Sequence, residues 1–308
     1  MAFNQQSNPE LVQADDQLIA VEQLLPRTAR SGDARRFIAF AHRNRISLDW
    51  FWTIRGDDGL PRTCVLVVPS EGRTAMFFTS EADDDATRTQ LTKLLGHAIT
   101  FLAQQPVDLA QALLLPGDSL GYSAFADARF EELATLQYME CETAIQEQAP
   151  SVPNELKLVT YQDSNQSDLL AVLEASYEDT LDCPGLRGLR ATEDVIKGHQ
   201  STGHFIPSLW TLAIHEEKPV GCVLINESNN GKQAELVYLG LAPEVRGNGY
   251  GRVLTCHALW LAKRERLHYL SLAVDMKNTP ALRLYESLGF SATNQRLAVI
   301  RSTRSLQD

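Results

Sequence analysis

A glycine-dense segment, Ala242–Leu254 (APEVRGNGYGRVL), carries the clearest chemical signal in the sequence. It follows an apolar stretch that predicts a strand, and it leads into an amphipathic run that predicts a helix. Its glycines stand at alternate positions: Gly247, Gly249 and Gly251. Glycine permits positive φ and a close approach of the backbone to a ligand. The N–H groups at the start of the helix, aided by its dipole and flanked by Arg246 and Arg252, are therefore expected to face phosphate oxygens.

Two other phosphate-binding motifs do not fit the same segment. A dinucleotide-binding GxGxxG would need a third glycine where Arg252 stands. A P-loop would need Gly-Lys followed by Ser or Thr, which the segment lacks. The glycines alone leave open a third interpretation, in which the loop only turns the chain.

With these residues in view, the sequence resembles the GNAT superfamily of N-acetyltransferases, whose pyrophosphate motif is Gln or Arg, two residues, Gly, one residue, then Gly or Ala. Arg246, Gly249 and Gly251 match that motif. The segment DMKNTPALRLYESLGF, residues 275–290, looks like the second cofactor segment of the family, and the resemblance extends over residues 155–303.

The resemblance implies a mixed sheet that splays at the motif strand, with acetyl-coenzyme A lying in the split. The strand backbone would pair with the pantetheine arm, and the loop would hold the pyrophosphate. The residues so assigned are Leu239, Gly240, Leu241, Arg246, Gly247, Asn248, Gly249, Tyr250, Gly251, Arg252 and Asn278.

Acetylation of an amine requires a base. An amine with a pKa of about 10.4 is free in roughly one molecule in 2,500 at pH 7, a penalty of about 4.6 kcal/mol. Alternation along residues 233–241 predicts one face shared by Glu235, Val237, Leu239 and Leu241. Glu235 is the candidate base, provided that burial raises its pKa. The alternative is a solvated glutamate at an exposed strand end.

The departing thiolate requires an acid, and a tyrosine with a pKa near 10 suits a thiol with a pKa of about 8.5. Tyr285 is the candidate, because a tyrosine at this helix position commonly acts as the acid in the family that the sequence resembles. Thr279 as N-cap, Pro280 at the first helical position and Gly289 beyond the end frame its helix. The alternative is a core tyrosine whose hydroxyl is satisfied.

The acceptor amine is expected to bind before the motif strand, where acidic residues would suit a cation. The candidates are Glu178, Asp179 and Asp182. Cys183, His199 and His204 lie in the same region, but their spacing fits no metal-ligand motif, so no metal is expected. An ordinary polar surface loop is the alternative.

The order of predicted elements is the same in both halves: helices, three strands, helix, strand, helix, strand. This repetition predicts a duplicated α/β fold of two GNAT-like domains, each a mixed, mostly antiparallel sheet flanked by helices. The expected domains are residues 1–142 and 155–308, joined by a polar, proline-containing linker over residues 143–154.

The first half lacks the motif at the corresponding place. There it has SEADDDATRTQ, in which Asp83, Asp84 and Asp85 set three negative charges where a pyrophosphate would lie. The first domain is therefore expected to be a degenerate partner of the second, similar in arrangement to tandem two-domain acetyltransferases.

Composition excludes several other classes. The chain has 308 residues and a net charge of −11, and residues 1–150 carry 21 acidic against 12 basic side chains, which disfavours nucleic acid as a partner. No long apolar run or secretory signal is present, so neither membrane insertion nor secretion is expected. The five cysteines are scattered, as free thiols in the cytoplasm would be.

The sequence thus predicts a cytoplasmic enzyme that transfers an acetyl group from acetyl-coenzyme A to a primary amine of a small molecule or peptide. A non-catalytic acyl-coenzyme A sensor or scaffold is the alternative from a different class. The acid and base candidates favour the enzyme, since a binding module needs neither. The oligomeric state is open, with a homodimer as one option.

Overall fold

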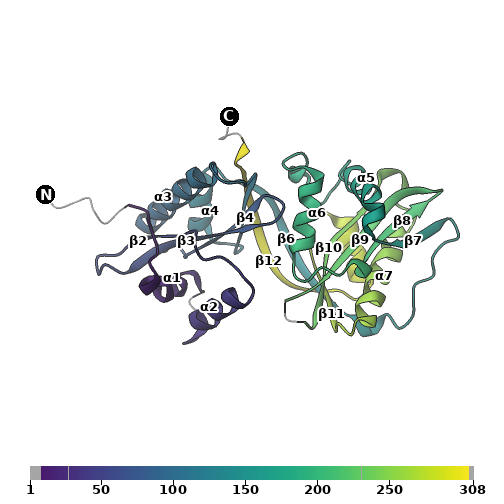
Figure 1. Cartoon of the computed structure of the whole chain (residues 1–308), viewed down its shortest axis with the longest axis horizontal. Coiled ribbons are helices and arrows are strands. Elements are labelled where there is room, and N and C mark those ends of the chain that lie inside the picture. The colour runs from purple at the N-terminus through teal and green to yellow at the C-terminus, as the bar shows by residue number, and fades with distance from the viewer. Residues whose placement is uncertain (1–7, 27, 230, 305–308) are drawn as a thin grey trace. The chain divides into compact units, whose positions relative to one another are not determined.

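The computed structural model describes residues 8–26, 28–229 and 231–304, so the first seven residues of the acidic opening segment lie outside it. The chain forms two compact units (Figure 1). Unit 1 runs to Glu132 and resumes at Leu297, and unit 2 comprises Leu133–Arg296. These boundaries differ from the expected domains. Residues 143–154 lie inside unit 2, where Thr143 donates from its hydroxyl to the Leu267 carbonyl at 2.6 Å.

Unit 1 is a mixed sheet with helices, in the order β1-β2-β3-β4-β5-β12. Only the β4–β5 pairing is parallel. Its elements are β1 (Glu10–Leu11), α1 (Gln17–Leu24), α2 (Asp33–Arg43), β2 (Phe51–Arg55), β3 (Pro61–Ser70), β4 (Thr74–Thr79), α3 (Asp85–Leu102), β5 (Leu109–Leu114), α4 (Ser119–Asp127) and the later part of β12 (Ser291–Ser302).

Unit 2 repeats this plan in the order β7-β8-β9-β10-β11-β6, in which β10 and β11 are parallel and the other described pairings from β7 to β6 are antiparallel. The first part of β12 lies beside β6. Its elements are β6 (Glu131–Glu142), β7 (Leu156–Thr160), α5 (Gln166–Ser176), α6 (Thr192–Ser201), β8 (Trp210–His215), β9 (Lys218–Glu227), β10 (Gln233–Leu241), α7 (Tyr250–Arg264), β11 (Tyr269–Asp275) and α8 (Thr279–Ser287). The predicted duplication and mixed α/β class are confirmed.

The last strand of each unit comes from the other half of the chain. In unit 1, β5 pairs with β12, so that Leu297 lies opposite Leu114. The strand that follows β5 in sequence, β6, pairs instead with β11 of unit 2. The two halves have therefore exchanged their closing strands, which explains why neither expected boundary coincides with a unit boundary.

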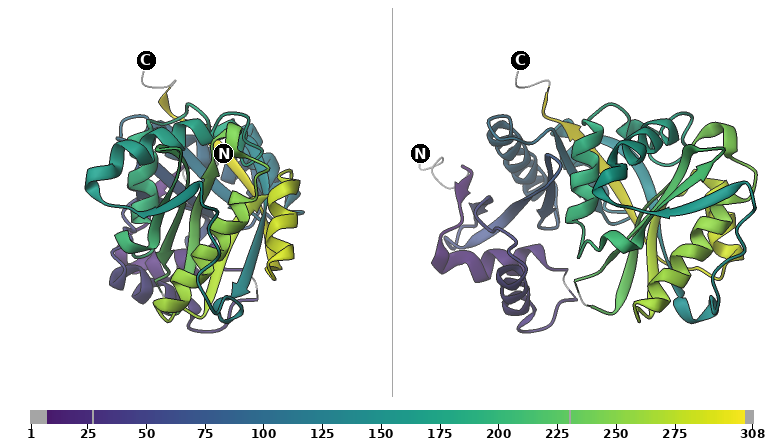
Figure 2. Two further views of the ribbon diagram at one scale, coloured as in Figure 1. Left: turned by 90° about the vertical axis from the view of Figure 1, so that its right-hand side faces the viewer. Right: turned by 45° about the vertical axis from the view of Figure 1, so that its right-hand side comes forward.

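The sheet of unit 2 separates two apolar cores (Figures 1 and 2). Helices α7 and α8 pack on one face through residues such as Leu254 and Leu288. Helices α5 and α6 pack on the other through residues such as Leu169 and Ile196. In α7 the buried positions recur every three or four residues, which gives that helix one apolar stripe. The site described below lies where the strands between these two layers part.

Candidate active site

The sheet of unit 2 opens between β10 and β11. Their parallel pairing covers three residue pairs and ends where Glu235 lies opposite Ser271. Beyond this point β10 continues beside β9 as far as Leu241, while β11 continues beside β6 as far as Asp275. The edge of β10 that faces β11 therefore has no strand partner from residue 236 onward, and its backbone groups are available to an extended ligand.

A β-bulge changes which side chains face the opening. The β9–β10 register shifts between Leu236 and Tyr238. After the bulge, Tyr238 packs towards α5 and α6, whereas Leu239 and Leu241 pack in the core beside α7. The predicted face shared by Glu235, Val237, Leu239 and Leu241 is therefore wrong, because the extra residue reverses the alternation.

Glycine is required in β10 itself. A Cβ atom on Gly240 would lie 2.7 Å from the Ser176 hydroxyl oxygen and 2.7 Å from a ring carbon of Tyr238. That hydroxyl also bonds the Tyr238 hydroxyl at 2.7 Å. The backbone of β10 and the end of α5 are thus held in direct contact at the opening.

The loop between β10 and α7 has the geometry of an anion site. Gly247 and Gly249 have φ of +85° and +81°, and nothing lies within 4 Å of a Cβ atom built on either. Gly249 is the N-cap of α7 and supplies no capping side chain. Among the described residues, the backbone N–H groups of residues 247–251 have no hydrogen-bond partner. Five consecutive free donors at a helix start form an unfilled anion-binding surface.

Arg246 has a structural part that the sequence did not predict. Its guanidinium donates to four backbone carbonyls, those of Leu241, Ser176, Glu178 and Asp179, at 3.1, 3.0, 2.7 and 3.1 Å. Three of these carbonyls lie at or just beyond the end of α5, where unpaired C=O groups need donors. Arg246 therefore positions the loop, and that its charge also serves a phosphate stays a prediction.

The other predicted coenzyme residues are placed around the loop. Arg252 donates to the Ser287 hydroxyl at 2.5 Å and so joins α7 to α8. The Tyr250 side chain is buried in the core, with its ring 5.9 Å from that of His215. Asn248 is exposed. Asn278, rather than the predicted Thr279, is the N-cap of α8, and its side chain accepts from the Ala281 N–H at 3.3 Å. The cap bond uses the side-chain oxygen of Asn278, so the side-chain NH2 group takes no part in it.

Tyr285 lies on α8 and is 6% exposed. Burial, with a smaller contribution from the negative charge of Asp182, raises the pKa of its hydroxyl, which therefore holds its proton. Among the described residues the hydroxyl has no hydrogen-bond partner, unlike the satisfied core tyrosine that was the alternative. A protonated, unpaired hydroxyl is suited to give its proton to a developing anion.

Glu235 lies at the point where the strands part, and it is half-buried rather than solvated at a strand end. Burial raises the pKa of its carboxyl, which is the change a general base needs. Its charge in turn contributes, after burial, to the raised pKa of Tyr138 on β6. Sequence reasoning missed Tyr138, because the exchange of closing strands brings β6 to this site.

The acidic candidates for the acceptor are placed less favourably. The side chains of Glu178 and Asp179 are exposed, and their carbonyls are bound by Arg246. The carboxylate of Asp182 accepts from the Asp275 N–H at 2.9 Å, and that of Asp275 accepts from the Cys183 N–H at 3.3 Å. These bonds tie the loop to the end of β11, so Asp182 positions the loop.

Cys183 and the nearby histidines have the following surroundings. Burial raises the pKa of the Cys183 thiol to about 12, so it is not a nucleophile near neutral pH. His204 joins β9 through a backbone bridge to Glu227. Across the part of the chain that the structure describes, no group of three or more His, Cys, Asp or Glu side chains could hold a metal ion.

The sequence did not predict a cavity in this loop region, but the structure has one. It has a volume of about 260 Å³ and lies between α5, the following loop and α6. Its lining residues are Glu174, Tyr177, Leu186, Arg187, Gly188, Arg190, Thr192 and Val195. The two arginines are visible in the sequence as GLRGLR, residues 185–190. The acidic residues before them instead led to the prediction of a cationic acceptor.

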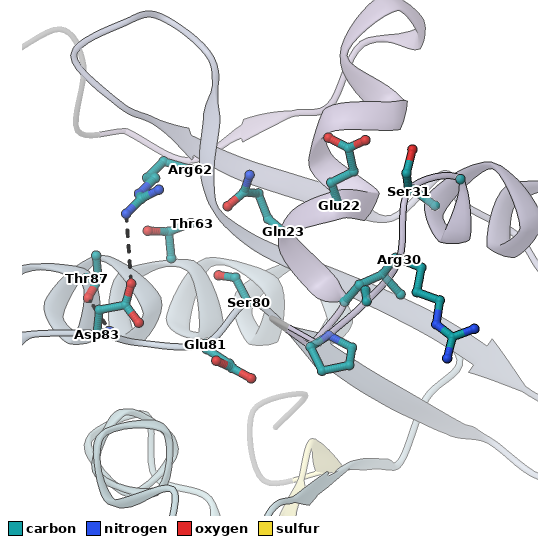
Figure 3. Close-up of a pocket in the computed structure, with 15 residues that line it drawn as sticks. Glu22, Gln23, Arg30, Ser31, Arg62, Thr63, Ser80, Glu81, Asp83 and Thr87 are labelled. Atoms are coloured by element: carbon teal, nitrogen blue, oxygen red, sulfur yellow. Dashed lines mark hydrogen bonds and ion pairs between the residues drawn. The ribbon is translucent and has the colours of Figure 1, made fainter.

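Unit 1 has a pocket at the place that corresponds to the glycine loop, after β4 and at the start of α3 (Figure 3). Here the helix caps itself: Asp84 accepts from the Thr87 N–H at 2.8 Å, and the Thr87 hydroxyl accepts from the Asp84 N–H at 3.1 Å. Glu22, Glu81 and Asp83 also line the pocket. A carboxylate thus already occupies the helix start that a pyrophosphate would need.

Unit 2 thus combines a sheet that opens between β10 and β11 with a start of α7 that no side chain caps. Residues 173–290 match the model of the Acetyltransferase (GNAT) family, so this segment is a GNAT acetyltransferase domain.

Curated relatives match parts of the chain. A mycothiol acetyltransferase of Thermobispora bispora is 32% identical over 149 residues, which are 46% of this chain and 49% of that protein. A mycothiol acetyltransferase of Acidothermus cellulolyticus is 39% identical over 90 residues, 29% of this chain and 27% of that protein. The peptidyl-lysine N-acetyltransferase YjaB of Salmonella typhimurium is 29% identical over 117 residues, 35% of this chain and 73% of that protein. The chain thus spans half or less of the two mycothiol acetyltransferases that it matches.

Solved structures match almost the whole chain in fold. A GCN5-related N-acetyltransferase from Sphaerobacter thermophilus aligns over 95% of this chain and 93% of its own, with a TM-score of 0.62 and 16% identity. A tandem GNAT protein from the clavulanic acid biosynthesis pathway aligns over 96% and 98%, with a TM-score of 0.54 and 14% identity. Both units therefore have the GNAT-like fold. None of the helices within the described ranges is long and apolar enough to cross a membrane.

Proposed function

We propose that the protein is an acetyl-coenzyme A-dependent N-acetyltransferase whose active site lies in unit 2. The amine nitrogen of the acceptor attacks the thioester carbonyl, a C–N bond forms, and the C–S bond breaks. The amine gives up a proton to Glu235, directly or through a water, and the leaving thiolate of coenzyme A takes a proton from Tyr285. The products are the N-acetylated acceptor and free coenzyme A.

The observation that carries this proposal is the set of five unpaired N–H groups at residues 247–251. They would accept a diphosphate, since no capping side chain competes for them. The unpaired edge of β10, with Leu239, Gly240 and Leu241, would bind the pantetheine arm by strand-like hydrogen bonds, and the Asn278 amide would contact the same arm. The co-substrate is thus the ligand that fits both features at once.

The states of Tyr285 and Glu235 support catalysis rather than binding alone. A coenzyme sensor would need neither a protonated, unpaired tyrosine nor a half-buried carboxyl at the point where the strands part. Burial keeps the Tyr285 hydroxyl protonated, and it raises the pKa of Glu235 from its ordinary value, as a general base requires. No metal is required for this chemistry, since the thioester is already an activated acyl donor.

The relatives indicate the class of acceptor. One relative is a mycothiol acetyltransferase, which acts on a small molecule, and another is a peptidyl-lysine N-acetyltransferase. We therefore propose a primary amine of a small molecule or a peptide as acceptor. We further propose that unit 1, with its self-capped helix α3, binds no coenzyme at the corresponding place and instead supports unit 2.

The test combines calorimetry with an assay for released thiol. Full-length protein is titrated with coenzyme A and with acetyl-coenzyme A, and thiol release is then followed over a panel of amines. We expect saturable heat with both ligands and steady turnover with at least one amine. Absence of heat with either ligand would remove the proposal, and saturable binding without turnover over a broad panel would favour the sensor.

A further inference from the structure

The cavity between α5 and α6 differs in charge from the expected acceptor site. Of its charged lining residues, Arg187 and Arg190 are cationic and Glu174 is the one carboxylate. Glu174 accepts a hydrogen bond from the Thr192 hydroxyl at 3.3 Å, across the same cavity. In a chain with a net charge of −11, two guanidinium groups around one small cavity form a local positive site.

The two arginines are placed differently. Arg187 is exposed, and among the described residues its guanidinium has no bonding partner. Arg190 is half-buried beside Tyr177 and His199. Burial raises the pKa of Tyr177 to about 12, while the charge of Arg190 acts in the opposite direction. The Tyr177 hydroxyl therefore keeps its proton and is a donor to any anion in the cavity.

The cavity adjoins the reaction site through Tyr177. The ring of Tyr177 lies 6.0 Å from that of Tyr238 on β10, and Tyr238 faces the same layer as Glu235 because of the bulge. Tyr238 lies three positions after Glu235 on the strand, a rise of roughly 10 Å at about 3.3 Å per residue. Asp182, in the loop between α5 and α6, contributes to the electrostatic environment of both Tyr177 and Tyr285.

The distribution of charge therefore runs from a basic cavity to an acidic opening. Glu235 lies at the opening, and Glu140 of β6 is aligned with it through Ser271. An amine would be drawn to that end, and an anion on the same molecule to the arginines. Guanidinium groups bind carboxylate and phosphate oxygens with paired hydrogen bonds.

We propose that the acceptor carries an anionic group, a carboxylate or a phosphate, in addition to its amine, and that Arg187 and Arg190 bind this group. The inference rests on the proposed function and deepens it, because it specifies the class of acceptor. A peptide with a free C-terminus and an amino-alkyl phosphate share the required chemistry. The two charges would be separated by more than a single α-amino acid allows.

The experiment uses matched pairs of acceptors with the full-length protein and coenzyme A bound. One pair is a tripeptide with a free C-terminal carboxylate and the same tripeptide as its C-terminal amide. The other is an amino-alkyl phosphate and the corresponding amino-alcohol. Binding is measured by calorimetry and acetylation by thiol release, for the natural protein and for Arg187→Gln, Arg190→Gln and Arg35→Gln. Arg35 is an exposed arginine of α2 in unit 1 and serves as the control.

We expect the anionic member of one pair to bind roughly ten-fold or more tightly than its neutral partner, a preference that Arg187→Gln or Arg190→Gln removes and Arg35→Gln retains. The pair that shows the preference distinguishes carboxylate from phosphate. Coenzyme A affinity should be the same in all four proteins. If acid and amide, and phosphate and alcohol, bind equally or not at all, the proposal of an anionic acceptor is overturned, whether or not any amine is acetylated. If coenzyme A itself does not bind, the proposed function fails instead.

Discussion

The Nη2 atom of Arg246 donates to the Ser176 carbonyl at 3.0 Å, so the first residue of the coenzyme loop holds the last residue of α5. The side chain thereby links the loop to the segment that precedes the acceptor region. The same Ser176 bonds Tyr238 of β10 through its hydroxyl. The loop, α5 and the open strand are thus fixed to one another through two residues, and several consequences of this arrangement are open to measurement.

Arg246→Gln should destabilise the protein and weaken coenzyme binding together. The change leaves four carbonyls without their donor, which we expect to cost about 2 kcal/mol of unfolding free energy. Arg246→Lys should lose nearly as much unfolding free energy, because an ammonium group cannot reproduce the planar arrangement of N–H donors in a guanidinium. Arg252→Gln, which removes one exposed bond to Ser287, should cost no more than about 0.5 kcal/mol. Urea unfolding and calorimetry with coenzyme A measure both quantities. Equal stability of the two Gln variants would contradict the positioning role of Arg246.

Tyr285→Phe should slow turnover while leaving coenzyme affinity nearly unchanged. The phenylalanine keeps the buried ring but removes the proton donor, and general acid catalysis contributes at least about 100-fold. Tyr161→Phe, at another buried tyrosine in the core beside α5, should have little effect on turnover. Steady-state thiol release and coenzyme titrations on both variants provide the measurement. Natural turnover in Tyr285→Phe would remove this residue from the mechanism.

Glu235→Gln should remove the acidic limb of the pH–rate profile. Burial raises the pKa of this carboxyl, and a base works in its ionised form. Activity of the natural protein should therefore fall as the pH drops through that raised pKa, above the range of an ordinary glutamate. The glutamine variant should be slower at all pH values and lack this limb. Glu193→Gln, at an exposed position of α6, should keep the natural profile. A profile of unchanged shape in Glu235→Gln would assign the base elsewhere.

Mild acid should destabilise the fold through His199. Its Nε2 atom is buried without a partner, and burial, followed by the charge of Arg190, lowers the pKa of this imidazole to about 4. The unfolded state binds a proton near pH 6.5 and the folded state does so only near pH 4, so stability falls as the pH drops between these values. His199 alone should cost about 2 kcal/mol at pH 5 relative to pH 7.5.

The comparison for this effect is His199→Phe, unfolded in urea at both pH values. Part of the acid sensitivity should remain, since burial also lowers the pKa of His257 to about 4. A variant that loses as much stability as the natural protein between pH 7.5 and pH 5 would show that His199 is already charged in the folded state.

Coenzyme A should bind with a stoichiometry of one per chain. Unit 1 has its helix α3 closed by the reciprocal bonds of Asp84 and Thr87. Calorimetry gives the stoichiometry directly, and Gly249→Ala, which places a side chain at a φ of +81°, should weaken the single site. A second equivalent of coenzyme A per chain would contradict the degenerate role of unit 1.

Much of the fold follows from the sequence because it depends on local pattern. The period-two strands and the helices that share one apolar face occur in the predicted order in both halves. The glycine loop was also evident, since Gly247 and Gly249 are needed for backbone conformations that other residues rarely adopt. These features depend on neighbours within a few residues of one another.

Features that depend on distant partners were not accessible in this way. The bulge at Leu236 is set by hydrogen bonding to β9 and reverses the face of Leu239. The carbonyl partners of Arg246 come from the end of α5, and Tyr138 reaches Glu235 only because β6 closes the sheet of unit 2. A strand pattern identifies a strand but does not say which strand will lie beside it.

The exchange of β6 and β12 has a consequence for biosynthesis. While the chain emerges from the ribosome, unit 1 has no partner for the outer edge of β5 until Leu297–Ser302, far later in the chain, have been translated. Loss of these few C-terminal residues would leave an unpaired edge in a sheet made long before, a known starting point for aggregation. Neither half alone contains all the strands of its own sheet, so a truncation or recombination that separates the halves leaves both sheets incomplete.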